Sequence, residues 1–382
     1  MPWRNMRIAV DMRSVAETGG RISGVENYFI NIFNRLTLDG GDEIIPVINR
    51  YKSVRFPKEL KYCSNLKQTN IPNKIFNALL YISGYPKFES IYGDFDLLWM
   101  PDIRPFSISK KTKLAITVHD ISSIVSPEYY SVQRRIWHKI ADYGRAIKRA
   151  DIIFAVSEYT KEEIITKYKI NPDKIQVVYP AVDRNIFHPL KEDDKEKFAD
   201  VKKRYGLPGK YILTLSTIEP RKNIQTLIEA FEQIQSETYL VIGGKLGWLY
   251  KDILKRIENS PKRKFIKMLG YVSEKDKPLI MAGAEILCYP SFYEGFGFQP
   301  LEAMSSGVPV IASTRTSVPE VCGGAALLVE PYHSKDIAKA IELLLSDEGL
   351  RKRLIEKGLQ RSMDFNWQDS AAKIYSSFRN LK

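Results

Sequence analysis

The chain has 382 residues, which is long for one hydrophobic core and comfortable for two domains. Its hydrophobic content of 44% and charged content of 27% are ordinary for a globular protein, whereas its formal net charge of +13 at pH 7 is not. That charge favours an acidic partner: nucleotide phosphates, nucleic acid or an anionic membrane surface. A protein that is simply basic, without such a partner, is the alternative.

Cysteine usage and hydropathy favour a reducing, cytoplasmic location. Cys63, Cys288 and Cys322 are too few for a disulfide framework or a zinc site. The nearest candidate for a membrane span, Ile75–Tyr85, falls short of the ~20 residues that a membrane-spanning helix needs. Met1–Arg7 runs directly into a predicted strand, so we expect no N-terminal signal.

The first half of the chain alternates predicted strands and helices. A buried opening strand is predicted at Arg7–Asp11, followed by the Gly-rich loop Thr18–Gly24 and a helix at Val25–Leu36. This order can place a phosphate at a helix N-terminus, but the G-x-G-x-x-G spacing is missing and a plain surface loop is an equal alternative. Further strands are predicted at Glu43–Ile48, Asp96–Trp99, Lys113–Val118, Asp151–Val156 and Ile175–Tyr179.

This alternation predicts a parallel sheet with right-handed crossovers, and hence a doubly wound first domain over residues 1–185. The strand Lys113–Val118 ends at His119-Asp120, on the carboxyl side where such sheets bind ligands. A lone histidine is more often structural than catalytic, and the position of His119 at a strand end is what makes it a candidate.

Ser131–Ala150 is predicted to be one amphipathic helix. Its apolar stripe has helical spacing and the rest of its surface is strongly basic. The helix can pack on the sheet with a solvated basic face, which we favour, or it can contact anionic lipid headgroups. The stripe consists of Val132, Ile136, Ile140, Tyr143 and Ile147, and the basic residues are Arg134, Arg135, Lys139, Arg145, Lys148 and Arg149.

The second half begins with Phe187–Gly206, whose charge density predicts a linker and an exposed helix. The strand and helix pattern then restarts, which predicts a second doubly wound domain over residues 186–366. A helical pair, Glu348–Met363 and Trp367–Leu381, ends the chain. The predicted strands are Tyr211–Ser216, Tyr239–Gly243, Lys264–Leu269, Glu285–Tyr289, Val308–Ala312 and Ala326–Val329, with helices at Asn223–Gln233, Tyr250–Ile257, Lys275–Ala282 and Ser334–Leu345.

Two loops of the second domain carry chemically suggestive residues. In Glu219–Asn223, Arg221 and Lys222 stand where a helix begins, although the helix dipole favours negative charge there. A bound polyanion would remove this conflict, and two solvated cations are the alternative. The other loop, Gly243–Trp248, follows a strand and its glycines are equally explained by a tight turn.

The stretch Leu287–Ser313 combines most of the features of a ligand site. Glu294 and Glu302 flank a Gly-rich turn between a strand and a short helix. Gly295 and Gly297 allow close approach of the backbone, and the helix N-terminus offers N–H groups to an anion. Together with the cations, this inventory suits a sugar nucleotide: N–H groups and cations for a diphosphate, carboxylates for hydroxyls.

With these residues the chain resembles the retaining glycosyltransferases of the GT-B fold, family 4, and within it the bacterial mannosyltransferase-like branch that builds O-antigen and other surface polysaccharides. The resemblance covers nearly the whole chain and is most specific at Glu294-x7-Glu302, within SFYEGFGFQPLEAMSSGVPVIAS. Supporting matches are Gly24 in SGVENY, His119-Asp120, Val156-Ser157-Glu158, Tyr179–Asp183, Glu219–Asn223 and Gly270-Tyr271-Val272.

The resemblance implies an α/β GT-B fold in which two Rossmann-like domains face each other across a cleft, with the terminal helix at 367–382 crossing back onto the first domain. It also implies a catalytic set of His119, Glu294, Lys222 and Arg221. Glu294 would bind hydroxyls of the transferred sugar, Lys222 with Arg221 would neutralise the diphosphate leaving group, and His119 would contact the sugar near its reacting carbon.

The donor-binding set implied by the resemblance lies mostly in the second domain. Glu302 would bind the ribose hydroxyls, and the backbone around Tyr271 and Val272 would border the base. Gly24 would approach the diphosphate from the first domain. The N–H groups of the turn and helix start would hold the phosphates, at Gly295, Phe296, Gly297 and Phe298–Leu301.

One departure concerns the phosphate-binding arginine. Many relatives carry Gly-Arg shortly before the Pro-x-Lys segment, where this chain has Ser216-Thr217. We expect Arg221 to take over this role.

The expected activity is the retaining, metal-independent transfer of a hexose, with GDP-mannose favoured over UDP-sugars, to a glycan or lipid-linked acceptor. No cluster of metal ligands and no cofactor are expected, and the protein would be cytoplasmic with a peripheral contact at the inner face of the membrane. A sugar-nucleotide epimerase and a catalytically silent subunit are the alternatives. Nucleic-acid binding is the least favoured, since no recognition motif appears.

Overall fold

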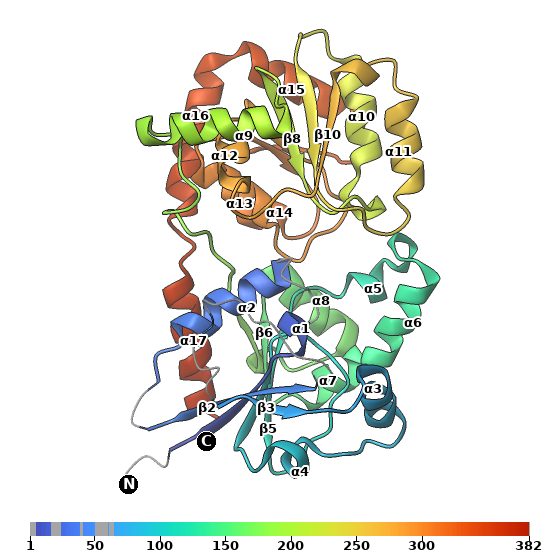
Figure 1. Ribbon diagram of the computed structural model, residues 1–382, viewed down its shortest axis with the longest axis vertical. Helices are drawn as coiled ribbons and strands as arrows, with labels where there is room; N and C mark the ends of the chain where they lie inside the picture. Colours follow the sequence, from blue (N-terminus) through green and yellow to red (C-terminus); the bar gives the residue numbers. More distant parts are fainter. Residues whose placement is uncertain (1–4, 17–23, 39–40, 50–59, 61–64, 382) are drawn as a thin grey trace. The chain divides into compact units, whose positions relative to one another are not determined.

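The computed structural model describes residues 5–16, 24–38, 41–49, 60 and 65–381, and it divides into two compact units (Figure 1). Each unit is built around its own parallel sheet with helices on both faces, so the predicted α/β fold with two Rossmann-like, doubly wound domains is confirmed. Unit 1 comprises Met1–Ile121, Val132–Pro180 and Trp367–Lys382, and unit 2 comprises Ser122–Ser131 and Ala181–Asn366.

The sheet of unit 1 has seven parallel strands in the order β3-β2-β1-β4-β5-β6-β7. The order reverses between β1 and β4, and ligands of such sheets bind beyond the carboxyl ends at this point. β4 and β6 are buried at every position, as expected of strands covered on both faces. The strands are β1 (Arg7–Asp11), β2 (Glu43–Asn49), β3 (Lys67–Thr69), β4 (Leu97–Met100), β5 (Lys113–Val118), β6 (Ile152–Ala155) and β7 (Ile175–Val177).

Helices cover both faces of this sheet, and the last helix of the chain is one of them. The helices of unit 1 are α1 (Arg13–Ala16), α2 (Gly24–Arg35), α3 (Asn73–Ile82), α4 (Phe88–Tyr92), α6 (Val132–Ala141), α7 (Tyr143–Arg149), α8 (Glu158–Tyr168) and α17 (Trp367–Arg379). No range was predicted for β3, α1, α3, α4 or α8. The predicted loop Thr18–Gly24 lies outside the described residues except for Gly24, which begins α2.

α17 lies beside α2 in unit 1 (Figure 1) and is anchored there by packing and by a buried carboxylate. The Phe378 ring packs against the Trp99 and Phe154 rings, at centroid distances of 5.7 and 5.9 Å. Asp42 accepts hydrogen bonds from the Tyr375 hydroxyl at 2.7 Å and from Arg379 at 2.7 and 2.8 Å. The end of the chain is thereby connected to the start of the first sheet.

The predicted helix Ser131–Ala150 is wrong in one respect: it is two helices. Asp142 separates α6 from α7 and has a φ of 49°, in the left-handed region that aspartate tolerates better than most residues. Its side chain accepts a hydrogen bond from the Arg145 N–H and so caps α7. Of the residues of α6, Ala141 is the buried one.

The sheet of unit 2 has six parallel strands in the order β10-β9-β8-β11-β12-β13. The strands are β8 (Tyr211–Leu215), β9 (Tyr239–Gly243), β10 (Ile266–Gly270), β11 (Ile286–Tyr289), β12 (Val310–Ser313) and β13 (Leu327–Val329). The helices are α5 (Ser122–Val125), α9 (Lys195–Tyr205), α10 (Ile224–Gln233), α11 (Lys251–Glu258), α12 (Lys277–Ala282), α13 (Phe298–Ser305), α14 (Val318–Cys322), α15 (Ser334–Ser346) and α16 (Glu348–Ser362).

Successive residues of these strands enter two separate cores, one on each face of the sheet. Ile286 and Cys288 of β11 belong to a core with α10 and α15, whereas Leu287 and Tyr289 belong to a core with α12 and α13. This is the two-residue period of a strand that is buried on both faces. β11 lies between β8 and β12 in the sheet and is buried on both faces, and the turn that contains Glu294 follows it.

The segment Ser122–Ser131 belongs to unit 2, although the predicted first domain ran without interruption to residue 185. The Tyr130 ring stacks on the Trp248 indole at 5.3 Å, and the indole N–H donates to the Tyr129 carbonyl at 2.5 Å. The Tyr129 ring stacks on Phe292 at 5.6 Å. Aromatic contacts between residues more than a hundred positions apart in the chain are not visible in local sequence patterns.

We expect Asp42→Asn to lower the free energy of unfolding by roughly 2–3 kcal/mol, the usual contribution of hydrogen bonds to a charged group. Burial alone would raise the pKa of Asp42, but the hydrogen bonds from Tyr375, Met6 and Arg379 outweigh burial and hold that pKa below its ordinary value. The stabilisation is therefore present above the unfolded pKa and is lost as the pH falls through the folded pKa. Urea unfolding at pH 7 and pH 3 measures both effects.

Asp364→Asn is the matched control, since Asp364 is half exposed and pairs with Arg361 at 2.8 Å. An exposed pair contributes less than about 1 kcal/mol. Equal effects of the two substitutions at pH 7 would show that Asp42 does not anchor α17.

Candidate active site

The centre of the candidate site in unit 2 is the carboxylate of Glu294, on the turn beyond the carboxyl end of β11. It is 7% exposed, and its two oxygens meet two different cations. Glu294 Oε1 lies 2.6 Å from Lys222 Nζ, and Oε2 lies 3.4 Å from the Arg221 guanidinium. The structure thus brings together three of the four residues of the predicted catalytic set, from segments 72 positions apart.

A second carboxylate orients the arginine of this cluster. Glu219 is fully buried and accepts from Arg221 Nε at 3.1 Å and from its NH2 group at 3.0 Å. The other end of the guanidinium donates to the Tyr293 carbonyl at 3.1 Å. Arg221 is therefore fixed on three sides, and the cluster contains two cations and two carboxylates.

The electrostatics of the cluster keep Glu294 ionised. Burial by itself would raise the pKa of the Glu294 carboxyl, but the neighbouring Lys222 ammonium and Arg221 guanidinium outweigh burial and hold that pKa below its ordinary value. A carboxylate that stays charged is an acceptor for the hydroxyl groups of a ligand and is not a general acid at neutral pH.

The segments that carry Lys222 and Glu294 are held in place by hydrogen bonds from side chains to backbone carbonyls. Asn223, at a φ of 56°, donates from its amide to the carbonyls of Pro290 and Pro331 at 2.9 and 2.6 Å. On the other side, Ser317 Oγ donates to the carbonyls of Glu294 and Phe296, each at 2.9 Å. The turn is thereby tied to the loops after β8 and after β12.

The turn ends at Gly297, where α13 begins. Gly297 has a φ of 101°, which a residue with a side chain rarely adopts, and as the N-cap residue it has no side chain that could cap α13. The first N–H groups of a helix point away from it and carry partial positive charge. Phe298, the first residue of α13, is where the predicted phosphate contact would begin.

Glu302, the second predicted carboxylate, forms a separate ion pair on α13. Its Oε1 atom lies 2.6 Å from Lys277 Nζ, and the ammonium also lies 5.4 Å from the Phe187 ring centroid. Burial lowers the pKa of Lys277, but Glu302 and Glu274 outweigh it and raise that pKa. Glu302 Oε2 is buried and has no hydrogen-bond partner among the described residues.

Lys277 was missed in the sequence. It stands in the charged run Ser273–Lys277, where nothing distinguishes it from the solvated lysines around it. Its position in the first turn of the predicted helix Lys275–Ala282 was the one available signal. The contact with Glu302 depends on how α12 packs against α13, which is a tertiary property.

The Gly-rich loop after β9 has a packing role in the structure. A Cβ atom on Gly244 would lie 1.7 Å from the Ser216 carbonyl oxygen, and one on Gly247 would lie 2.7 Å from the Thr217 side chain. The glycines allow this loop to lie against the segment after β8. Val272 is buried after β10, while the Tyr271 side chain beside it is exposed at the carboxyl end of the strand.

The remaining predicted residues, His119 and Gly24, lie in unit 1. His119 follows β5, its Nε2 atom lies 2.8 Å from the Pro101 carbonyl oxygen, and its ring contacts Tyr28 edge-on at 5.1 Å. Tyr28 lies one turn after Gly24 on α2. The histidine and the start of α2 are therefore on the same carboxyl edge of the first sheet.

A buried ion pair at the end of β1 was not predicted. Arg13 donates to both oxygens of Asp11, with distances of 2.6 to 3.0 Å, and both side chains are almost fully buried. The arginine also lies 5.3 Å from the Phe88 ring centroid. The pair stands at the topological switch point of unit 1, on the same edge as His119.

Among the described residues there is no group of three or more His, Cys, Asp or Glu side chains placed to hold a metal ion. The one D-x-D spacing of the sequence, Asp94-Phe95-Asp96, precedes β4, where Asp96 accepts from the Arg7 N–H at 2.9 Å, at the edge opposite to the strand carboxyl ends. Every helix in the described part of the chain is too short or too polar to cross a bilayer.

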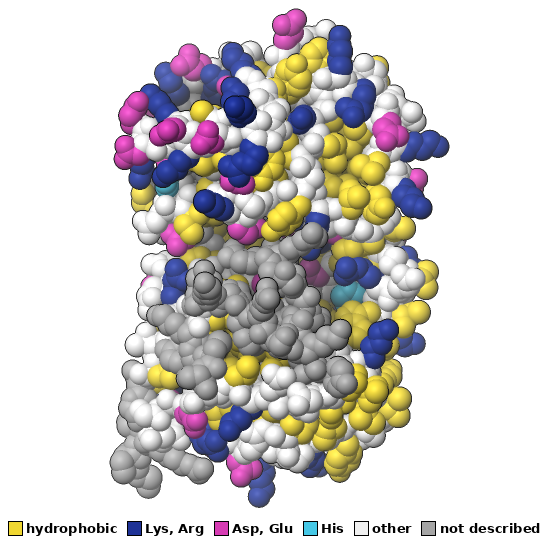
Figure 2. Space-filling view, viewed as in Figure 1, with side chains coloured by type: hydrophobic (Ala, Val, Ile, Leu, Met, Phe, Trp, Pro, Cys, Tyr) yellow, Lys and Arg dark blue, Asp and Glu magenta, His cyan; other side chains and the backbone are white. Residues whose placement is uncertain are grey.

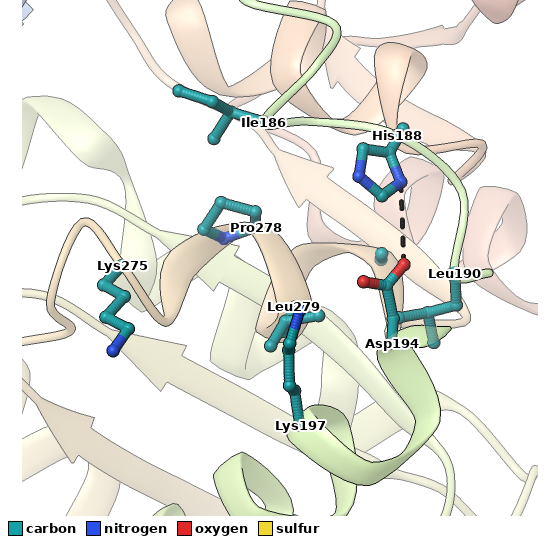
Figure 3. A pocket seen from close by; sticks show the side chains of 9 residues that line it. Ile186, His188, Leu190, Asp194, Lys197, Lys275, Pro278 and Leu279 are labelled. Carbon is teal, nitrogen blue, oxygen red and sulfur yellow. Dashed lines mark ion pairs between the residues drawn. The ribbon is translucent and has the colours of Figure 1, made fainter. Parts of the chain in front are cut away.

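Unit 2 also has a pocket that is lined by none of the predicted site residues (Figure 3). It is formed by the linker, α9 and α12, and its polar members include His188, whose Nδ1 atom lies 3.8 Å from Asp194. Lys197 and Lys275 also line it. The pocket is small and open. None of the hydrogen bonds and ion pairs described for its residues leads to the Glu294 cluster.

Residues 195–361 match the family model of glycosyl transferases group 1, and residues 22–185 match the model of glycosyltransferase family 4. The O-antigen chain mannosyltransferase B of Escherichia coli is 32% identical over 282 residues, which cover 72% of this chain and 73% of that protein. The serotype-specific mannosyltransferase WbdA of Escherichia coli is 29% identical over 279 residues, and the chain spans only 34% of its length.

Among solved structures, sucrose-phosphate synthase from Thermosynechococcus elongatus is similar to this chain, with a TM-score of 0.74 and 19% identity over 99% of both chains. At this identity the likeness concerns the fold, which is the GT-B arrangement of two Rossmann-like domains. With two family models on consecutive parts of the chain and a relative above 30% identity along most of it, the protein belongs to the family 4, group 1 glycosyltransferases.

Proposed function

We propose that this glycosyltransferase transfers mannose from GDP-mannose to a glycan or lipid-linked acceptor in surface polysaccharide biosynthesis, with retention of configuration and without a metal ion. The observation that carries the proposal is the buried Glu294 carboxylate held between Lys222 and Arg221. The similarity to two mannosyltransferases of Escherichia coli supports mannose as the transferred sugar, and GDP is expected as its carrier.

In this proposal the cations act on the leaving group. Negative charge develops on the phosphate oxygen as the glycosidic bond to the donor breaks, and fixed cations and N–H dipoles stabilise it without reorganisation. Lys222 and Arg221 supply the positive charge, and the start of α13 supplies N–H groups near Phe298. Retention would follow from attack on the same face, with the leaving phosphate oxygen accepting the proton of the acceptor hydroxyl.

The carboxylates are proposed to accept hydrogen bonds from hydroxyl groups of the donor. Glu294 would accept hydrogen bonds from the transferred sugar, and Glu302 would accept from the ribose diol through its unpartnered Oε2 atom. Tyr271 would border the base, while Gly24 and His119 of unit 1 would contact the diphosphate and the sugar. Glu294 and Glu302 therefore serve as acceptors, and neither is used as an acid or nucleophile.

A peripheral contact with an anionic membrane through residues 131–150 belongs to the same proposal, since a lipid-linked acceptor would be reached from the membrane surface.

The donor is tested by thermal unfolding with GDP-mannose, GDP, UDP-glucose and UDP. A ligand at 100 times its Kd stabilises the folded state by about 2.7 kcal/mol, so GDP-mannose should raise Tm by several degrees. Stabilisation by UDP-glucose but not by GDP-mannose would overturn the donor assignment. Appearance of an epimer of the donor sugar without any acceptor would favour the epimerase alternative.

We expect Glu294→Gln and Lys222→Met each to lower kcat by roughly 10²–10³-fold, the cost of removing one preorganised group that acts on the transition state. Glu229→Gln and Lys251→Met are matched controls, because both side chains are exposed on helices of the same unit. Transfer of radiolabelled mannose to an acceptor measures the rates. Unchanged glycan synthesis in cells with Glu294→Gln, alongside its loss on gene deletion, would favour the silent-subunit alternative.

Lys277→Met should reveal whether Glu302 binds the donor. The substitution leaves a buried carboxylate without its cation, so the free energy of unfolding should fall by roughly 3–5 kcal/mol. In the double variant Lys277→Met with Glu302→Met, most of that stability should return because no buried charge is left. Donor affinity should stay roughly 10- to 100-fold lower, since the ribose acceptor is gone. Full affinity in the double variant would show that the pair is structural.

A further inference from the structure

α3 presents most of its apolar side chains to solvent. It is described throughout, and its buried residues are Phe76 and Leu80. The rest of the helix and the turn that follows expose large hydrophobic groups, of which Ile82 is 82% and Tyr85 62% exposed. The exposed members are Ile75, Leu79, Tyr81, Ile82 and Tyr85. Exposed apolar side chains that occur singly are ordinary, but five in eleven positions form a patch.

α6 repeats this arrangement. Val132 and Ile136, one turn apart on the same face, are 69% and 55% exposed, and Trp137 beside them is partly exposed. The apolar stripe that was predicted to pack on the sheet therefore faces outward along most of α6. Ile147 on α7 is buried, so the sheet-packing half of the predicted stripe lies after the break at Asp142.

The two helices belong to the same side of unit 1 (Figure 1). A Cβ atom on Gly84, in the turn after α3, would lie 4.0 Å from the guanidinium of Arg145 on α7, and α7 follows α6 after one residue. On this side of the molecule Figure 2 shows hydrophobic side chains gathered over α3, with Lys and Arg side chains close by.

Every charged residue of these segments is basic. Residues 73–87 and 132–141 contain Lys74, Lys87, Arg134, Arg135 and Lys139, all exposed, and they contain no Asp or Glu. The whole chain contains 45 acidic and 58 basic residues. The 25 positions of these two segments contain only basic ones, so their composition differs from that of the chain as a whole. Basic groups around exposed aliphatic and aromatic side chains are the composition of segments that lie in the interface of anionic bilayers.

We propose that α3 and α6 form one docking surface for an anionic lipid bilayer, with Leu79, Ile82, Val132 and Ile136 entering the headgroup boundary. A second copy of the chain fits less well, because it would bring five more cations against these five. The biological reason for docking, a lipid-linked acceptor, rests on the proposed function. The surface itself requires neither donor nor acceptor.

Flotation of the full chain with vesicles tests the proposal. We expect the protein to float with phosphatidylcholine vesicles that contain 30% phosphatidylglycerol and to remain unbound with pure phosphatidylcholine. Leu79→Ser with Ile82→Ser should lower the partition coefficient at least tenfold, and so should Arg134→Ala, Arg135→Ala and Lys139→Ala together. Salt at 0.5 M should weaken binding of the wild type, because the electrostatic part is screened.

Matched controls come from exposed residues of unit 2. Leu328→Ser with Leu343→Ser removes the same kind of exposed apolar surface, and Lys203→Ala, Lys255→Ala and Lys357→Ala make the same change in net charge. Neither control should alter flotation. Equal losses in variants and controls, or equal binding to both kinds of vesicle, would overturn the proposal.

Trp137 provides a direct readout of insertion. Vesicles of brominated lipid should quench tryptophan fluorescence of the wild type, and most of that quenching should disappear in Trp137→Phe. Equal quenching in both proteins would show that α6 does not enter the bilayer. If the protein ignores vesicles but forms a dimer that Ile82→Ser abolishes, the surface is a self-interface and the lipid assignment is wrong.

Donor binding, measured by calorimetry without vesicles, separates this proposal from the proposed function. The α3 and α6 variants should bind GDP-mannose as the wild type does. Retained donor binding without any vesicle binding would overturn the docking surface alone, whereas vesicle binding without donor affinity would overturn the donor assignment alone.

Discussion

The ionised carboxylate of Glu294, buried beside two cations, is the constraint around which unit 2 is arranged. A charge out of water is costly unless it is paired and its partners are fixed. The surroundings meet this requirement: Glu219 holds Arg221, and Asn223 and Ser317 tie the neighbouring loops to the turn. Such a cluster is a weak source of stability, but it keeps charges in one geometry, which is what stabilisation of a developing phosphate charge requires.

The Glu302 carboxylate is also buried, but its partners differ from those of Glu294. One oxygen is neutralised by Lys277, and the other is buried without a partner among the described residues. Leaving such an atom unpaired costs free energy that a ligand hydroxyl can recover on binding. The two carboxylates of the same sequence motif thus pair with separate cations. This separation supports the proposal that one carboxylate binds the sugar and the other the ribose.

The parts of this structure that were predictable depend on local periodicity. Buried parallel strands are continuous apolar runs, so twelve of the thirteen strands in the described residues coincide with predicted ones to within about two residues, while the short and exposed β3 has no such run. The Glu294 turn and the cations after β8 were visible because glycines and charges stand at strand ends. Lys277, the Asp11–Arg13 pair and the segment Ser122–Ser131 depend on packing between distant elements, which no local pattern contains.

The helix predicted at Ser131–Ala150 shows the limit of periodicity in a different way. An apolar stripe establishes that a helix has two unlike faces, but it does not establish what covers the apolar one. The break at Asp142 divides the stripe, so that Ile147 of α7 is buried in unit 1 while Val132 and Ile136 of α6 face outward. The buried half of the stripe therefore lies on α7. Exposed apolar groups on α6 and on α3, in segments whose own charged residues are Lys and Arg, are therefore the observation on which the proposed docking surface rests.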